Sequence, residues 1–299
     1  MSAHDYEDYE KACKNYDEFR LAAGGETELN ALRRLGKPLR DLHIADVGCG
    51  TGNYTKYFLD NGVGKVSMFD ASEGMLRYAR TKVADYVAAG RVPHCEQLEL
   101  PCPIPGGEQR YDAICINFVL HHLGSPDDDL ATETFPKAMA AIRNVYDALR
   151  KGGLFILLSS LRPQLPHIMW HTSFITDLDD LFNQPIIKFV CGDYNIIERA
   201  LTKIGFSNMQ ATVPLHEILL KPHHYYNIDN ASDPRFIQSV STFALIKNRD
   251  KNKGTNHMET YFQRLRDSKE RNELAAVIEE KETLRKIYGC ITAISAEKP

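Results

Sequence analysis

Three glycines in a G-x-G-x-G array are the residues of this chain whose spacing points most directly to chemistry. They are Gly48, Gly50 and Gly52, and the apolar stretch His43–Val47 precedes them. A glycine lets the backbone approach a ligand at a point where a Cβ atom would clash. A buried strand, a glycine turn and a helix beginning at Asn53 predict a nucleotide-class site at the carboxyl end of a parallel strand.

The spacing of these glycines discriminates between two classes of cofactor. A dinucleotide site carries G-x-G-x-x-G, and its third glycine would fall on Asn53 or Thr55, depending on which glycine begins the count. The dinucleotide pattern therefore fails in both registers. The segment Asp46 through Gly52, D-x-G-x-G-x-G, instead resembles motif I of the class I S-adenosylmethionine (SAM) methyltransferases.

Further segments follow in the order that this family shows, and they cover roughly residues 40–160. The whole order resembles the small-molecule enzymes related to the ubiquinone and menaquinone C-methylases. The matching segments are Asp46 through Gly52, Asp70 through Leu76, Leu100-Pro101 before Tyr111-Asp112, Val119 through Leu123, and Leu149 through Gly153 with Lys151 in place of the family's proline. Several motifs in the right order are far more specific than any one of them.

The resemblance implies how SAM would be held. The glycines admit its methionine part, and the following helix N-terminus favours its carboxylate. Asp46 would accept from its ammonium group, Asp70 would accept both ribose hydroxyls, and Glu96 would take the acidic slot beside adenine, where the family usually has Asp. The implied cofactor residues are Asp46, Gly48, Cys49, Gly50, Gly52, Asn53, Asp70, Ala71, Met75, Glu96, Gln97, Leu98 and Asn117.

An N-terminal Y-D-x-x-R segment, Tyr16 to Arg20, resembles a segment that precedes motif I in related enzymes. The resemblance implies that it folds over the cofactor, with Arg20 near the carboxylate. An ordinary amphipathic helix face is the alternative interpretation.

The implied reaction is in-line displacement of the sulfonium methyl, with S-adenosylhomocysteine as product and no metal. Positioning does much of the work in such a transfer, and a general base is needed only when the nucleophile arrives protonated. His121 and His122 follow the fourth expected strand and are candidates to orient a substrate or accept a proton. Trp170 and His171 are candidates for substrate contact. For all four residues, structural packing is the alternative interpretation.

Strands that alternate with helices predict an α/β, Rossmann-like fold with helices on both faces of a seven-stranded, mostly parallel sheet. Apolar runs and helical spacing predict the elements. We expect strands at 43–47, 65–70, 92–95, 111–117, 154–158, 207–214 and 290–295, and helices at 5–22, 26–36, 53–60, 73–87, 135–149 and 194–204.

The change of pattern after residue 160 predicts the organisation of the chain. Residues 1–40 are expected to form a helical segment over the cofactor site. Residues 41–219 and 288–299 would form the SAM-binding domain, with a lid at 160–192. Residues 220–287, with helical signals at 234–246, 256–267 and 268–287, would form a helical insertion or cap.

Composition limits the class of protein. The 299 residues are 43% hydrophobic and 25% charged, as in a soluble globular protein. A net charge of -4 argues against nucleic acid or an anionic membrane as the partner. Seven cysteines without a C-x-x-C pair predict no metal site and a reducing compartment, the cytoplasm. The charged first twenty residues predict no signal peptide.

Two other functions remain open at this point. A SAM-binding regulatory or scaffold protein without activity would preserve the same cofactor motifs. A protein methyltransferase is the other alternative, although no N-P-P-Y or D-P-P-Y follows the fourth expected strand, which continues Asn117-Phe118-Val119-Leu120. The acceptor atom, whether N, O, S or C, and the oligomeric state are not indicated, because function is set outside the shared scaffold.

Overall fold

A seven-stranded sheet forms the centre of the chain, whose computed structural model describes residues 9–299. Its order is β3-β2-β1-β4-β5-β7-β6, and β7 runs antiparallel to both of its neighbours. The strands are β1 (His43–Val47), β2 (Lys65–Asp70), β3 (Cys95–Gln97), β4 (Tyr111–Asn117), β5 (Leu149–Ser159), β6 (Ser207–Thr212) and β7 (Thr292–Glu297). The predicted Rossmann-like, mostly parallel sheet is confirmed.

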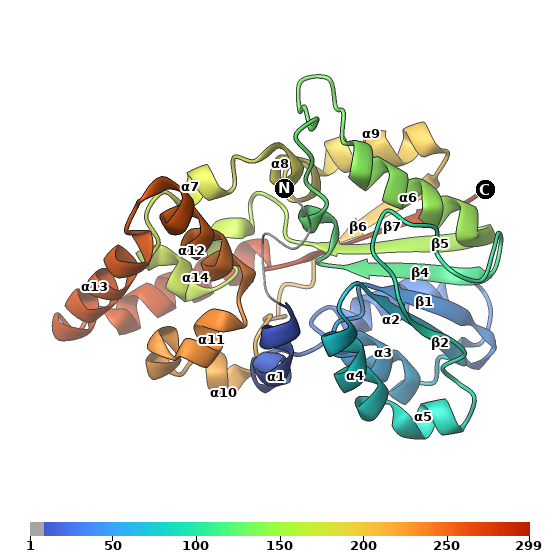
Figure 1. Cartoon of the computed structure of the whole chain (residues 1–299), viewed down its shortest axis with the longest axis horizontal. Coiled ribbons are helices and arrows are strands. Elements are labelled where there is room, and N and C mark those ends of the chain that lie inside the picture. Colours follow the sequence, from blue (N-terminus) through green and yellow to red (C-terminus); the bar gives the residue numbers. More distant parts are fainter. Residues whose placement is uncertain (1–8) are drawn as a thin grey trace.

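Helices cover both faces of this sheet (Figure 1), because successive residues of its buried strands point to opposite sides. On one face, α2 (Gly25–Arg33), α3 (Asn53–Asp60) and α4 (Glu73–Lys82) pack on Ile44, Met68 and Cys115. On the other, α6 (Pro136–Ala148), α8 (Pro185–Val190) and α9 (Tyr194–Ile204) pack on Ile114 and Phe155. The short helix α5 (Ala84–Ala88) follows α4.

A second group of helices lies beside the sheet domain, at the left of Figure 1. We call it the cap, and it comprises α7 (Leu178–Leu181), α10 (Pro222–Tyr225), α11 (Pro234–Gln238), α12 (Ser241–Lys253), α13 (His257–Glu270) and α14 (Leu274–Tyr288). Its own apolar core buries Trp170, Phe236, Phe243 and Tyr261 completely. Phe19, the last residue of α1 (Tyr9–Phe19), also belongs to this core.

The segment 160–192 is divided between two cores, and its role as a lid stays a prediction. Residues 169–175 enter the cap core, whereas Ile186 and Phe189 of α8 enter the sheet core. The ring of Phe189 stacks on that of Phe135 with centroids 4.3 Å apart. The first part of this segment therefore packs with the cap and the last part with the sheet.

Other predicted boundaries shift for local reasons. The third strand is β3 rather than 92–95, because Met68 of β2 pairs with Cys95. The expected helix 73–87 breaks at Val83, and 234–246 divides into α11 and α12. β5 begins five residues early, at Leu149, where it pairs with Tyr111 before a register shift. Within residues 9–299, none of the helices has the length and apolar character needed to cross a membrane.

Candidate cofactor site

The glycine turn joins β1 to α3 at the carboxyl edge of the sheet, and its three glycines do different things. A Cβ at Gly48 would collide with the Val119 side chain, and one at Gly52 would lie 3.2 Å from the Cβ of Ala79. A Cβ at Gly50 would have no neighbour within 4 Å. Gly48 and Gly52 thus permit the loop to pack, and Gly50 is the glycine of the array beside open space.

Asp70, the last residue of β2, holds this turn in place. Its Oδ2 accepts from the backbone N–H of Gly50 over 2.8 Å, and its Oδ1 accepts from that of Ser72 over 2.9 Å. The Phe69 carbonyl also accepts from the N–H groups of Gly48 and Cys49. Asp70 therefore lies at the glycine turn, and its role as the ribose acceptor stays a prediction.

The predicted adenine residues lie on β3 and just beyond it. Gln97 donates to the Ala71 carbonyl over 2.8 Å, and the Leu98 N–H donates to the Asp70 carbonyl over 2.9 Å. The Glu96 carboxylate instead bonds Nδ1 of His94 at 2.8 Å. The structure thus brings Gln97 and Leu98 beside Asp70, and the adenine role of Glu96 stays a prediction.

The first turn of α4 continues from Asp70. Ser72 caps this helix by accepting from the Met75 N–H over 3.1 Å, and Met75 is buried. Asn53, which begins α3, accepts from the Lys82 ammonium. Cys49 is buried within the turn, and this burial raises the pKa of its thiol. These predicted residues therefore lie on the glycine turn and on the first turns of α3 and α4.

Beneath the turn lies a buried group of oxygens that includes a residue the sequence analysis missed. Asp46 of β1 accepts from the Thr55 hydroxyl over 2.6 Å through Oδ2. Asn117, which ends β4, donates from Nδ2 to Oε2 of Glu28 on α2 over 3.3 Å. Within the described part of the chain, Oδ1 of Asp46, Oδ1 of Asn117 and Oε1 of Glu28 are buried without a hydrogen-bond partner.

Burial determines the charge of this group. It raises the pKa of Asp46 to about 6, and burial and the nearby Asp46 raise the pKa of Glu28 well above its usual range. A sequence signal for Glu28 existed: it lies on the apolar face of its helix with Leu29 and Leu32. Buried oxygens without donors fit the ammonium group of SAM, since a buried polar group needs a partner.

Helix α1 contacts the turn, and the predicted place of the Y-D-x-x-R segment over the cofactor stays a prediction. Asp17 pairs with Lys82 of α4 at 2.8 Å and accepts from the Thr51 hydroxyl. The Arg20 guanidinium lies 5.8 Å from the centre of the Tyr16 ring and donates to the Ser239 carbonyl of the cap over 3.2 Å. Contact of Arg20 with the cofactor carboxylate stays a prediction.

His121 and His122 follow β4 in a short 3-10 turn, with ring centroids 4.0 Å apart. Burial lowers the pKa of His121 to about 4 and that of His122 well below its ordinary value. Both rings are therefore neutral at neutral pH, and the lowered pKa makes them weak bases there. His122 lines a hollow of about 210 Å³ with the segment Glu99 to Cys102 and Lys137.

Trp170 and His171 lie in the cap core. Trp170 is completely buried, and its indole N–H donates to the Tyr225 carbonyl over 2.7 Å. The His171 ring packs between those of Trp170 and Phe236, at 4.4 and 4.6 Å between centroids. Both side chains are buried, so the structure does not support their predicted contact with an acceptor. Packing in the cap core explains the position of Trp170.

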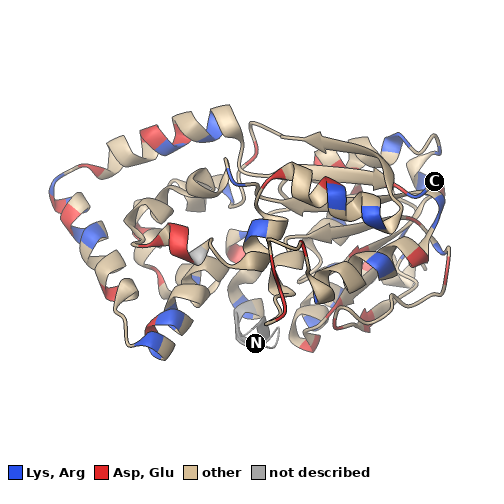
Figure 2. Cartoon of the chain, turned by 90° about the horizontal axis from the view of Figure 1, so that it is seen from above, with Lys and Arg blue, Asp and Glu red and all other residues tan. Residues whose placement is uncertain are grey.

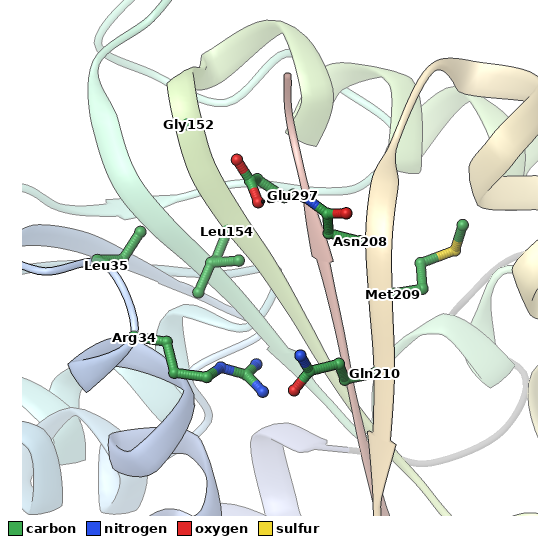
Figure 3. Close-up of a pocket in the computed structure, with 8 residues that line it drawn as sticks. All are labelled: Arg34, Leu35, Gly152, Leu154, Asn208, Met209, Gln210 and Glu297. Carbon is green, nitrogen blue, oxygen red and sulfur yellow. Dashed lines mark hydrogen bonds between the residues drawn. The ribbon is translucent and has the colours of Figure 1, made fainter.

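A separate hollow of about 550 Å³ lies at the opposite edge of the sheet, where β5 and β6 begin (Figure 3). Arg34, Gln210 and Glu297 contribute polar groups to it, and it contains none of the predicted site residues. In the described part of the chain, no group of three His, Cys, Asp or Glu side chains is placed to hold a metal ion. Transfer without a metal stays a prediction.

Comparison with known proteins agrees with this geometry. Residues 45–155, from β1 to β5, match the model of a methyltransferase domain. A demethylmenaquinone methyltransferase of Leptospira interrogans is 27% identical over 184 residues, which are 56% of this chain and 69% of that protein. A ubiquinone/menaquinone biosynthesis C-methyltransferase of Shewanella is 28% identical over 41% of this chain and 44% of its own length.

Solved structures include a phosphoethanolamine N-methyltransferase of Haemonchus contortus in complex with SAM. It is 16% identical, with a TM-score of 0.47, and the match covers 92% of this chain and 52% of that one. The alternative of a SAM-binding protein without activity gains no support from these comparisons. The motif order, the geometry of the turn and the matched family model show that residues 45–155 form a class I SAM-dependent methyltransferase domain.

Proposed function

We propose that the chain moves the methyl group of SAM to a small-molecule acceptor held between the sheet and the cap. The observation that carries this proposal is the way α1 connects the cap to the glycine turn. Asp17 of α1 contacts the Thr51 hydroxyl of the turn, while its backbone carbonyl accepts from the Lys221 ammonium over 2.6 Å. Residue 221 directly precedes α10 of the cap.

Further contacts strengthen this connection. Arg235 of α11 pairs with Glu18 of α1 at 3.0 Å, and the Phe19 ring packs against that of Phe236, with centroids 5.6 Å apart. A cofactor edge covered in this way suits a small acceptor better than a folded protein or nucleic acid. Figure 2 shows acidic and basic residues interspersed along the helices, a pattern that also gives little attraction for nucleic acid.

The chemistry assigned to SAM is delivery of an activated methyl group, and the chain positions the acceptor in line with it. We assign to His122, or to its neighbour His121, the removal of a proton from an acceptor that arrives protonated. Desolvation keeps both rings neutral but also makes them weak bases, so they suit an acceptor that loses its proton readily. Trp170 and His171 would shape the cap behind the acceptor.

For the acceptor we propose a small polar or aromatic metabolite. The names of the Leptospira and Shewanella relatives refer to quinones, which makes demethylated quinones the first compounds to test. We further propose that the reaction takes place in the cytoplasm.

A transfer assay with methyl-labelled SAM tests this proposal. The protein would be incubated with demethylated quinones, phenols, amines and thiols, and separately with protein and nucleic-acid fractions. We expect label in one small-molecule class and stoichiometric S-adenosylhomocysteine. The variant Gly50→Val serves as the control without a cofactor site. Label only in protein or nucleic acid would show that the acceptor class is wrong.

A further inference from the structure

The proposed function gives no role to the buried carboxyl group of Glu28. This side chain is completely buried on α2, although no basic residue is among its hydrogen-bond partners in residues 9–299. Charged groups are rarely buried without such compensation. The carboxyl group therefore requires an explanation beyond packing.

The surroundings of Glu28 are acceptors and weak acids. Asp46 faces it from β1, Cys115 and Asn117 face it from β4, and Tyr54 lies near it on α3. The Tyr54 hydroxyl does not donate to Glu28, because it donates to the Ala23 carbonyl over 2.7 Å. Arg20 is a cation that acts on Tyr54, but its guanidinium donates to the Ser239 carbonyl, and the groups that act most strongly on Glu28 itself are not cations. Burial therefore favours the protonated form of the carboxyl group.

The position of the group connects it to the glycine turn. Val47 of β1 pairs with Ile116 of β4, so Asn117 lies level with Gly48, where the turn begins. Because Glu28 accepts from the Asn117 amide nitrogen, the amide oxygen of Asn117 points away from Glu28. This oxygen and Oδ1 of Asp46 are buried, and neither has a hydrogen-bond partner among the described residues.

We infer that Glu28 is a positioning residue for the ammonium group of SAM: it orients Asn117, completes an acceptor recess with Asp46, and loses its proton when the ammonium binds. The O–H bond of the Glu28 carboxyl breaks and its proton passes to solvent, while the ammonium keeps all three of its protons. The new positive charge replaces the proton as the partner of the buried carboxylate. This inference rests on SAM binding and not on the identity of the acceptor.

Calorimetry with S-adenosylhomocysteine and with 5′-methylthioadenosine separates this role from a structural one. The first ligand carries the ammonium group and the second lacks the whole amino-acid part. Titrations at neutral pH in two buffers of different ionisation enthalpy count the protons released. We expect close to one proton released when the wild type binds S-adenosylhomocysteine and none when it binds 5′-methylthioadenosine.

The variant Glu28→Gln keeps the shape and the acceptor for Asn117 but has no proton to release. We expect it to bind S-adenosylhomocysteine about tenfold more weakly, as loss of a hydrogen bond to a charged group predicts, without proton release. Its affinity for 5′-methylthioadenosine should be unchanged. Glu26→Gln is the matched control, because Glu26 lies on the same helix but is half-exposed and pairs with Arg33 at 2.7 Å.

Two results would overturn the inference. One is wild-type binding of S-adenosylhomocysteine without proton release. The other is a Glu28→Gln variant that loses affinity for both ligands equally. If this variant does not fold, the number of protons released by the wild type tests the inference alone. Failure of the wild type to bind S-adenosylhomocysteine would overturn the cofactor assignment as well, so the two failures are distinguishable.

Discussion

The carboxylate of Asp70 accepts from the backbone N–H of Gly50 over 2.8 Å, so the end of β2 holds the glycine turn that follows β1. Twenty residues separate the two in the chain, and the parallel pairing of β1 with β2 brings them together. The acid expected to bind the ribose also shapes the loop that approaches the cofactor. Replacing Asp70 therefore affects the cofactor site in two ways.

Asp70→Ala should lower SAM affinity by about tenfold or more, because hydrogen bonds to a charged group contribute roughly 1.5–3 kcal/mol. Isothermal titration measures this change. Asp60→Ala is the control, because Asp60 is an acid on α3 that pairs with Lys56 at the surface. Equal affinities for Asp70→Ala and the wild type would mean that another residue holds the ribose.

Gly50→Val should abolish SAM binding, because it places a branched side chain in the open space beside the turn. Gly50 has φ 53°, so the variant also carries backbone strain of about 1–2 kcal/mol. Gly254→Val is the matched control, since Gly254 has φ 64°, an equally open environment and a place in the cap. We expect similar losses of thermal stability in both variants, and loss of binding only in Gly50→Val. Normal SAM binding by Gly50→Val would show that the loop is assigned wrongly.

His171 should make the stability of the protein depend on pH. Burial lowers the pKa of its ring to about 3 in the folded chain, whereas the unfolded value is about 6.5. Below about pH 6.5 the unfolded chain therefore takes up a proton that the folded chain does not. The free energy of unfolding thus decreases as the pH is lowered from about 6.5 to about 3.

The variant His171→Phe tests this dependence. Below about pH 6.5, its free energy of unfolding should change with pH less steeply than that of the wild type, by up to about 1.4 kcal/mol per pH unit. Urea unfolding at several pH values measures both slopes, and His223→Phe, which changes a neighbouring cap histidine, serves as the control. Identical slopes for His171→Phe and the wild type would contradict the buried, neutral state of His171.

Trp170→Ala should impair methyl transfer much more than it weakens SAM binding. Removing this buried ring and its bond to the Tyr225 carbonyl would cost about 3–5 kcal/mol of stability and loosen the cap. Misplacement of an acceptor is costly to rate. Steady-state kinetics and titration with S-adenosylhomocysteine separate the two effects, with Trp170→Phe as the milder variant. Unchanged turnover in a folded Trp170→Ala protein would show that the cap core does not contribute to the acceptor site.

Local sequence was sufficient for the sheet and for the outline of the cofactor turn. The all-buried run from Tyr111 to Asn117 forms β4 as predicted, because its central residues, Ala113 to Ile116, are apolar and covered on both faces of the sheet. The glycine array marks its loop because positive φ angles and close packing demand that residue type, as Gly48 shows against Val119. The position of Asp70 at the end of β2 was predictable because an acid that closes an apolar run is a local signal.

Tertiary structure decided what depends on residues far apart in the chain. Glu28 and Asn117 meet across 89 positions, and only the packing of α2 under the carboxyl edge of the sheet brings the two side chains together. The segment 160–192 looked uniform because its bulky residues are alike, yet Trp170 and Phe189 are buried in different cores. An aromatic side chain packs equally well in either core, because apolar burial is not directional. Its neighbours therefore come from the fold and not from its own segment.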